Sequence, residues 1–414
     1  MKDYLLKGVT LVETGHPLNN QIVDIRIQGA NITEIGTDLS VNTEEAINLS
    51  GQMVSSGWID AEIALSEPGY EAKGKLLDDL TSISKNGFTH IGLLPNTLPL
   101  PDKGSVLSFF NQYKNLPISI LPYGTLSLDS KGEELAELYD LKQSGAIAFV
   151  DYKKGITNTG LMKLALQYTQ PFDGIIGVFP CDYYLKGKGV VREGIASTRL
   201  GLKGIPSIAE SIRIQRDLEL LRYTGGKIHF MGISTLESIE LIREAKQEGL
   251  SVTASVSIGN LYFNDQKLEG FDSRYKLNPP LANEETRLKL IEALKEGTID
   301  IVVSDHFNCS TEEKNLEFDL AEFGSKTKDY LFPALSKLVG IEKAVEILCR
   351  GYQLFQISTP EIKEGSLANL SFFTTDKSYT AMEKDPQTEL FYGESFDTTG
   401  TGSFFNGILT LKQS

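Results

Sequence analysis

Carboxylate side chains follow a short apolar segment near residue 60 of this 414-residue chain, and they could act as acids, bases or metal ligands. Residues 53–59 have the apolar character of a buried strand, which then runs into Asp60 and Glu62. Side chains alternate between the two sides of a strand. One side would therefore carry Asp60, Glu62, Ala64 and Ser66.

Polar residues also follow most of the other apolar segments of strand length. The residues just past the segments are Asp60 with Glu62, Asn96, Tyr123, Asp151, Pro180 with Cys181, Gly232, Ser257 and Asp305. A hydrolytic zinc site needs imidazoles, thiolates and carboxylates around an open position for water. The chain has four histidines, and of these only His306 follows a strand directly. His229 lies in mid-strand, and His90 begins its strand.

The elements that must position these residues alternate between strands and helices. The apolar segments are 53–59, 89–94, 118–121, 146–150, 174–179, 227–231, 251–256 and 299–304. Eight such repeats in roughly 300 residues predict an α/β fold of the (β/α)8 TIM-barrel type, with its catalytic groups at the carboxyl ends of the strands. An open, doubly wound sheet is the alternative.

Residues 1–52 and the chain after about residue 360 read instead as short β-strands separated by turns. We expect a small composite β-sandwich domain built from both termini, comprising 1–52 and 362–414, with the barrel spanning 53–361. Within the barrel, Ser207 with Glu210 and Ser234 with Glu237 are spaced as capping boxes, and Asn283 is an expected N-cap.

The net charge of −15 argues against nucleic acid or an anionic membrane as a partner. Three widely spaced cysteines predict no disulfide framework, and no long apolar segment predicts a membrane span or a signal peptide. A cytoplasmic location is expected. The basic residues of DYKKG (151–155) and YKLN (275–278) are expected on the solvated surface.

Several short motifs together resemble the dihydroorotases and related cyclic amidohydrolases. SGWIDAEIALSEPG (56–69) resembles their first metal-binding motif. The further matching segments are LLPNT (93–97), GAIAFVDYKKG (145–155), FPCD (179–182), MGISTLES (231–238), KLNPPLA (276–282) and SDHFNC (304–309). The resemblance spans nearly the whole chain and implies the same barrel with a composite β domain.

The resemblance also shows where this chain departs from the family. Metal-binding histidines of the family correspond to Glu62, Ala64, Phe179 and Gly232. Ser66 and Ala282 replace arginines, and Cys309 replaces a further histidine. A serine cannot supply the charge or fork with which arginine holds a carboxylate. The positions retained for substrate binding are Asn96, Asn278 and His306. Asp305 is retained as the acid/base and Asp151 as a carboxylate ligand, and Asp60 of the first motif is also present.

The missing histidines predict a protein with no metal cofactor and no dihydroorotase activity. By analogy with inactive family members, we expect a structural or regulatory partner in pyrimidine biosynthesis, with aspartate carbamoyltransferase as the binding partner. A homo- or hetero-oligomer is expected. Phe179, Phe307 and Tyr152 are expected to fill part of the barrel mouth.

Two other interpretations remain open from the sequence. The chain could be a cyclic amidohydrolase with an altered centre, either an oxygen-ligand cluster of Glu62, Asp151 and Asp305 holding Mg²⁺, Mn²⁺ or Zn²⁺, or Asp305 acting without metal. Asp305 could equally be a structural carboxylate that pairs with a lysine. Alternatively, the barrel mouth could bind a small molecule through Asn96 and Asn278.

Overall fold

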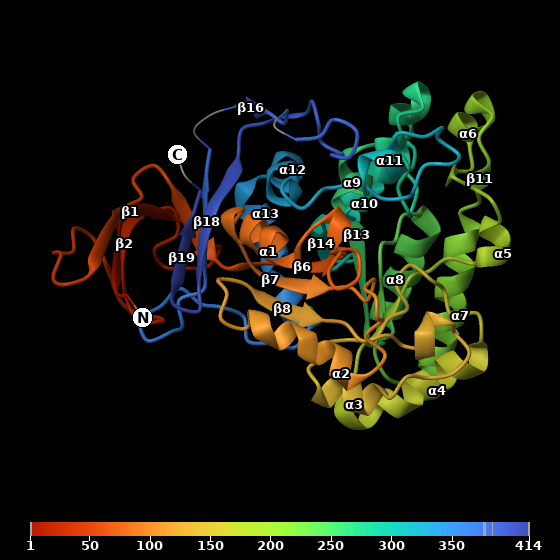
Figure 1. The fold of residues 1–414 in the computed structure, drawn as a ribbon, viewed down its shortest axis with the longest axis horizontal. Helices are drawn as coiled ribbons and strands as arrows, with labels where there is room; N and C mark the ends of the chain where they lie inside the picture. Colours follow the sequence, from red (N-terminus) through yellow and green to blue (C-terminus); the bar gives the residue numbers. More distant parts are fainter. Residues whose placement is uncertain (1, 376–377, 383, 413–414) are drawn as a thin grey trace.

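The computed structural model describes residues 2–375, 378–382 and 384–412. An α/β barrel occupies the middle of the chain, and a β domain built from both ends packs at one side of it (Figure 1). The predicted fold class is therefore confirmed. No helix in the described ranges is both long and apolar enough to cross a membrane.

The composite β domain has one eight-stranded sheet. Its strands are β1 (Tyr4–Leu11), β2 (Ile22–Gln28), β3 (Asn31–Gly36), β4 (Glu45–Asn48), β5 (Met53–Ser56), β15 (Leu370–Thr374), β18 (Thr399–Phe405) and β19 (Ile408–Leu411). In Figure 1 the red N-terminal strands lie beside the blue C-terminal ones. The order is β19-β18-β15-β5-β1-β2-β3, with β4 on β1. Alternating apolar residues of these strands, such as Leu6, Ile25 and Phe372, form its own core.

The barrel strands are β6 (Trp58–Ile63), β7 (Phe88–Leu93), β8 (Ser119–Pro122), β9 (Ile176–Val178), β12 (Ile228–Phe230), β13 (Val252–Ser257) and β14 (Ile301–Val303). They pair in parallel as β6-β7-β8 and β9-β12-β13-β14. Phe149 bridges these two groups through Gly124 and Ile176, so the predicted fourth segment takes part as an isolated bridge. A bridge between Ala64 and Phe307 closes the ring.

The first predicted barrel segment divides in two. Residues 53–56 form β5, which pairs with β15 in the β domain, and the barrel strand begins only at Trp58. Gly57 makes this transition possible, because a Cβ there would lie 1.8 Å from the Asn369 side chain. The register of β6 against β7 also shifts between Asp60 and Ile63, so the simple alternation expected for residues 60–66 does not hold.

Helices surround the barrel and are joined by irregular segments. They are α1 (Leu76–Lys85), α2 (Gly104–Leu107), α3 (Leu138–Gln143), α4 (Thr159–Thr169), α5 (Tyr183–Lys186), α6 (Ile195–Leu200), α7 (Ile208–Thr224), α8 (Leu236–Gln247), α9 (Ile258–Tyr262), α10 (Glu284–Glu296), α11 (Thr311–Lys314), α12 (Leu331–Val339), α13 (Ile341–Cys349) and α14 (Gly351–Leu354). Short β-ladders join β10 (Val191–Arg192) to β11 (Gly204–Ile205) and β16 (Tyr379–Thr380) to β17 (Ser395–Phe396).

The helix starts agree with only part of the sequence prediction. Asn283 caps α10 by accepting from Thr286 N, as expected. The α8 cap is Thr235 rather than Ser234, and Ser207 makes no side-chain cap bond on α7. Glu210 is directed away from Ser207 and holds a different segment, described below.

Candidate functional site

A lysine and an aspartate form an ion pair at the carboxyl ends of the barrel strands. Lys153 Nζ lies 2.8 Å from both carboxylate oxygens of Asp305 and donates to Asn278 O at 2.7 Å. Both Lys153 and Asp305 have φ +48°, a left-handed conformation that costs free energy for any residue except glycine. Burial raises the pKa of the Asp305 carboxyl, and the Lys153 ammonium opposes this rise.

A second buried pair lies near the first. Glu62 Oε1 is 2.8 Å from His229 Nε2, and His229 Nδ1 is 2.8 Å from Thr253 Oγ1. The exposed fractions of Glu62 and His229 are 4% and 1%. A buried carboxylate needs such a partner, because an unpaired charge in the interior is strongly destabilising. The resemblance places a metal-binding histidine of the family at position 62. In this structure Glu62 is instead hydrogen-bonded to the imidazole of His229.

The space between these pairs is small. Glu62, Lys153, Phe179, Asp305 and Tyr152 are among the residues around a cavity of about 20 Å³. That volume is enough for one water molecule. Side chains therefore fill the inner mouth, as predicted for Tyr152 and Phe179. Phe307, predicted with them, does not line this cavity but a second one further out.

The outer pocket, of about 430 Å³, lies on the other side of Tyr152, which lines both spaces. Its wall includes Ser66, Asn96 and Lys73. Asn96 Nδ2 donates to Leu65 O at 2.9 Å, whereas its buried Oδ1 has no hydrogen-bond partner in the described part of the chain. Such an orphaned acceptor is expensive unless something binds it. Asn96 thus lines this pocket and carries a buried acceptor that the described part of the chain leaves unpaired.

Two other retained positions have structural partners. Asp151 accepts from Leu126 N at 3.1 Å and from Ser127 N at 3.0 Å, and it also accepts from the Ser127 hydroxyl. His306 Nδ1 accepts from Thr327 N at 2.9 Å, so Nε2 carries the proton that it shares with Asn308, 2.7 Å away. Burial holds the His306 pKa well below its usual range, which keeps the ring neutral.

Gly232 shows why one family histidine is absent. Its φ is +66°, and a Cβ would lie 3.3 Å from Pro279 Cδ. A histidine here would need a left-handed backbone and would press on the segment that carries Asn278. Ala64 is used differently: its N donates to His306 O at 3.1 Å where the barrel closes.

The residues present do not fit the family's metal centre. Glu62 is paired with His229, Asp305 with Lys153 and Asp151 with Ser127, so the three carboxylates do not converge on one point. Among the described residues, no group of three or more His, Cys, Asp or Glu side chains is arranged to hold a metal ion. Cys181, Cys309 and Cys349 are free thiols.

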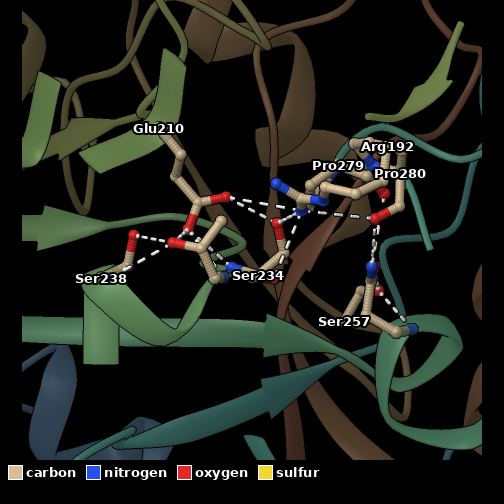
Figure 2. Close-up of polar contacts among 9 residues, drawn as sticks. Arg192, Glu210, Ser234, Ser238, Ser257, Pro279 and Pro280 are labelled. Atoms are coloured by element: carbon tan, nitrogen blue, oxygen red, sulfur yellow. Dashed lines mark hydrogen bonds and ion pairs between the residues drawn. The ribbon is translucent and has the colours of Figure 1, made fainter. Parts of the chain in front are cut away.

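A polar network behind the site explains why the STLES and NPPL motifs are present. Glu210 Oε1 accepts from Ser234 N at 2.8 Å and from Thr235 N at 3.1 Å (Figure 2). Arg192 donates to Ser234 O at 3.2 Å and lies 3.5 Å from Pro280 O. Arg192 therefore connects the residues that follow β12 to the segment that contains Asn278. The backbone oxygen of Asn278 is the one that accepts from Lys153.

Asn260 completes this attachment from the other side. Its Nδ2 donates to Pro280 O at 3.1 Å, and its Oδ1 accepts from Ser257 Oγ at 2.6 Å (Figure 2). The segment is thus held from both β10 and α9. Lys276, just before it, is buried and donates to Ala321 O at 2.6 Å and to Asp319 O at 3.0 Å.

Comparisons with known proteins agree with this architecture. Residues 51–238 match the family model "Dihydro-orotase-like". A dihydroorotase from Acetivibrio thermocellus is 36% identical over 422 residues, covering 97% of this chain and 99% of that protein. One from Carboxydothermus hydrogenoformans is 32% identical over 417 residues, covering 98% and 95%.

The chain belongs to the dihydroorotase family. Its fold is also that of an L-hydantoinase (dihydropyrimidinase) from Arthrobacter aurescens, with a TM-score of 0.85 and 20% identity over 100% of this chain and 97% of that one. A dihydropyrimidinase from Brevibacillus agri gives a TM-score of 0.81, with 20% identity over 99% and 95%.

Membership of this family corrects the expectation of a non-catalytic protein. The full-length relatives carry the name of an enzyme, which supports a catalytic cyclic amidohydrolase. The expectation rested on the four missing histidines and the missing arginine, and it gave no role to Lys153 and His229, which form polar pairs with Asp305 and Glu62 in the mouth. The expectation of no cofactor is contradicted as well, because enzymes of this family are typically metal-dependent. Binding to aspartate carbamoyltransferase stays an untested prediction.

Two further expectations about basic residues are wrong. Lys153 and Lys276 were both expected on the solvated surface, but each is drawn inward by oxygen acceptors. Buried carbonyl and carboxylate oxygens are costly unless a donor binds them, and a lysine ammonium can reach inward to do so. The single-letter sequence gives no signal for this, because the acceptors are supplied by loops far along the chain.

Proposed function

We propose that this protein hydrolyses a C–N bond of a cyclic amide at the barrel mouth. The observation that carries the proposal is the position of the Lys153–Asp305 pair, one side chain (Tyr152) away from a pocket of about 430 Å³ that contains Asn96. The names of the full-length relatives support the same class of reaction. Three free cysteines support a reducing, cytoplasmic location.

Asp305 acts as the acid/base in this reaction. Its carboxylate accepts a proton from water as the water oxygen bonds to the ring carbonyl carbon. It then returns that proton to the ring nitrogen as the C–N bond breaks, leaving a carboxylic acid and an amine. Burial suits this task, because it brings the pKa of Asp305 nearer to neutral pH. Lys153 uses its three protons on Asp305 and Asn278 and acts as a positioning residue.

The ring binds in the outer pocket, since the inner cavity of about 20 Å³ is too small for it. Asn96 Oδ1 accepts from a ring N–H, which satisfies its orphaned oxygen. Tyr152 separates the ring from Asp305 and must turn aside for the two to meet. The substrate class is therefore a small cyclic amide that presents an N–H next to the scissile carbonyl.

The test is hydrolysis of dihydroorotate, hydantoin and dihydrouracil by purified protein, assayed as isolated and with added Zn²⁺, Mn²⁺ or Mg²⁺. Turnover of one ring should be lost in Asp305→Asn and kept in Asp265→Asn, which changes a carboxylate in the 3-10 turn Asp265–Gly270. Turnover that persists in Asp305→Asn would refute the assigned role. Absence of turnover for every ring under every condition would refute the function.

A further inference from the structure

The segment that follows α11 forms one wall of the outer pocket. Residues 315–324 contain no helix or strand, and most of their side chains are exposed. Glu322 of this segment lines the outer pocket, and so does Phe307. The segment lies against Phe307, because a Cβ on Gly324 would be 3.0 Å from Phe307 Cβ. We call residues 315–324 the flap.

Two buried lysines hold the flap through its backbone. Lys276 donates to two flap carbonyls, as described above, and Lys314 Nζ donates to Glu322 O at 2.9 Å and to Gly324 O at 2.8 Å. Each lysine is only 2% exposed. In the part of the chain that the structure describes, neither ammonium forms an ion pair with a carboxylate. The hydrogen bonds that these lysines donate to the flap therefore all end on neutral oxygens.

Such an attachment is costly to maintain. A buried ammonium gives up its hydration, and neutral carbonyls compensate for that loss less well than a carboxylate does. Burial lowers the pKa of Lys314 to about 8 and also lowers the pKa of Lys276. Opening of the flap would return both ammonium groups to water. The hydrogen bonds lost on opening are thus largely offset by hydration, while the barrel beneath stays folded.

We propose that the flap opens as a unit and controls entry to the outer pocket. Asn315 caps the end of α11 at one end of the flap, and Gly324, with φ +94°, lies at the other. A glycine can absorb the backbone rotation that a hinge requires. The Phe323 ring defines the closed position, since Lys186 Nζ and Lys276 Nζ lie 4.7 and 4.8 Å from its centroid.

The inference goes beyond the proposed hydrolysis, because motion of the flap can be measured without substrate. Glu322 N donates to Glu313 O at 3.1 Å, and Gly324 N donates to Lys276 O at 2.9 Å. Both bonds join the flap to residues outside it, so they break when the flap opens. A fixed wall would expose these two amides only when the barrel unfolds, whereas a flap exposes them by local opening.

The experiment is hydrogen–deuterium exchange of the full-length protein, followed by mass spectrometry of peptides from the flap and from β13. In the wild type, the flap amides should exchange at least about tenfold faster than those of β13. Lys276→Met should accelerate exchange in the flap by a further factor of at least about ten and leave β13 unchanged. Lys246→Met is the matched control, because Lys246 also donates to a backbone oxygen, Gly297 O at 3.0 Å, and should leave exchange in the flap unchanged.

Access to the pocket is the second measurement. Ser66 lines the outer pocket but is only 3% exposed. The thiol introduced by Ser66→Cys should react with N-ethylmaleimide at least about tenfold faster when Lys276→Met is added, while the rate at Cys349 on α13 should not change. Equal acceleration of exchange in the flap and β13, or no acceleration in the flap, would overturn the proposal. Faster exchange in the flap without faster reaction in Ser66→Cys would overturn its control of the pocket.

Discussion

Lys153 and Asp305 form an ion pair in which each residue has a φ of +48° and the ammonium touches both carboxylate oxygens at 2.8 Å. Two non-glycine residues in left-handed conformation are costly, and such strain persists only where surrounding contacts enforce it. Here the enforcing contacts include the bond from Lys153 to Asn278 O. That carbonyl belongs to the segment held by Arg192 and Asn260.

Replacement of Lys153 should change both the stability of the protein and the pKa of Asp305, and the two effects can be measured separately. Lys153→Met leaves a largely buried carboxylate unpaired, which should lower the free energy of unfolding by about 3 kcal/mol. The pKa of Asp305 should then rise further, since burial already raises it and the opposing ammonium is gone. Denaturant unfolding measures the first effect, and the pH profile of kcat measures the second.

The double variant Lys153→Met/Asp305→Leu tests this explanation. It removes both charges, so most of the lost stability should return, whereas activity should not. Equal instability of the single and double variants would show that Lys153 stabilises the fold by packing rather than by its charge.

Replacement of Tyr152 should open the passage between the two mouth cavities. Tyr152→Ala removes the side chain that lines both, so cyclic amides with bulkier substituents should gain in kcat/KM relative to unsubstituted ones. Tyr152→Phe keeps the ring and should retain the wild-type preference. An unchanged preference in Tyr152→Ala would place the substrate path elsewhere.

Parts of this site could be predicted from sequence and parts could not. Asp305 and Asn96 were found because catalytic groups follow the strands of a barrel, a rule that needs only the order of apolar segments. His229 was set aside as a mid-strand residue. Its partners, Glu62 and Thr253, come from other strands and meet it only through the register of the closed barrel. Lys153 gives no signal in the sequence because its acceptors, Asn278 O and Asp305, lie in loops far along the chain.

The fold was predictable to a greater extent than the site. Continuous apolar segments separated by helical ones indicate a parallel α/β sheet, and their number, eight, favours a barrel over an open sheet. The error at residues 53–59 arose because a single apolar segment serves two sheets, with Gly57 at the crossing. The capping register of Glu210 with Ser207 was also misleading, because the backbone N–H groups of Ser234 and Thr235 attract the carboxylate more strongly.

The Glu210 network should contribute to stability and to the position of Asn278. Glu210→Ala removes the acceptor of two buried backbone N–H groups, which should cost about 2–3 kcal/mol in unfolding free energy. Glu219→Ala, on the exposed face of the same helix α7, should change it by less than about 0.5 kcal/mol. Equal effects of the two substitutions in denaturant unfolding would argue against the network.

A side chain at Gly232 should destabilise the protein more than one at Gly249, a glycine with a similar φ. Gly232 and Gly249 have φ of +66° and +79°, but only Gly232 has a neighbour, Pro279, within 4 Å of the added Cβ. Alanine at either position should cost about 1 kcal/mol for the backbone. Gly232→Ala should lose roughly 1 kcal/mol more through overpacking against Pro279. Equal losses in thermal unfolding would exclude that contact as a constraint.

Asp60 should make the protein less stable as the pH rises. Burial raises the pKa of Asp60 to about 7, with Ser304 N donating to it at 3.1 Å. The folded state therefore binds a proton that the unfolded chain has lost above its pKa of about 3.9. The stability that Asp60 contributes is fully present below that value and is lost as the pH rises toward 7. Asp60→Asn should remove this dependence on pH. The unfolding free energy of the variant, measured by denaturant unfolding, should therefore increase relative to that of the wild type between pH 5 and pH 8. A constant difference between the two proteins over that range would show that Asp60 does not titrate there.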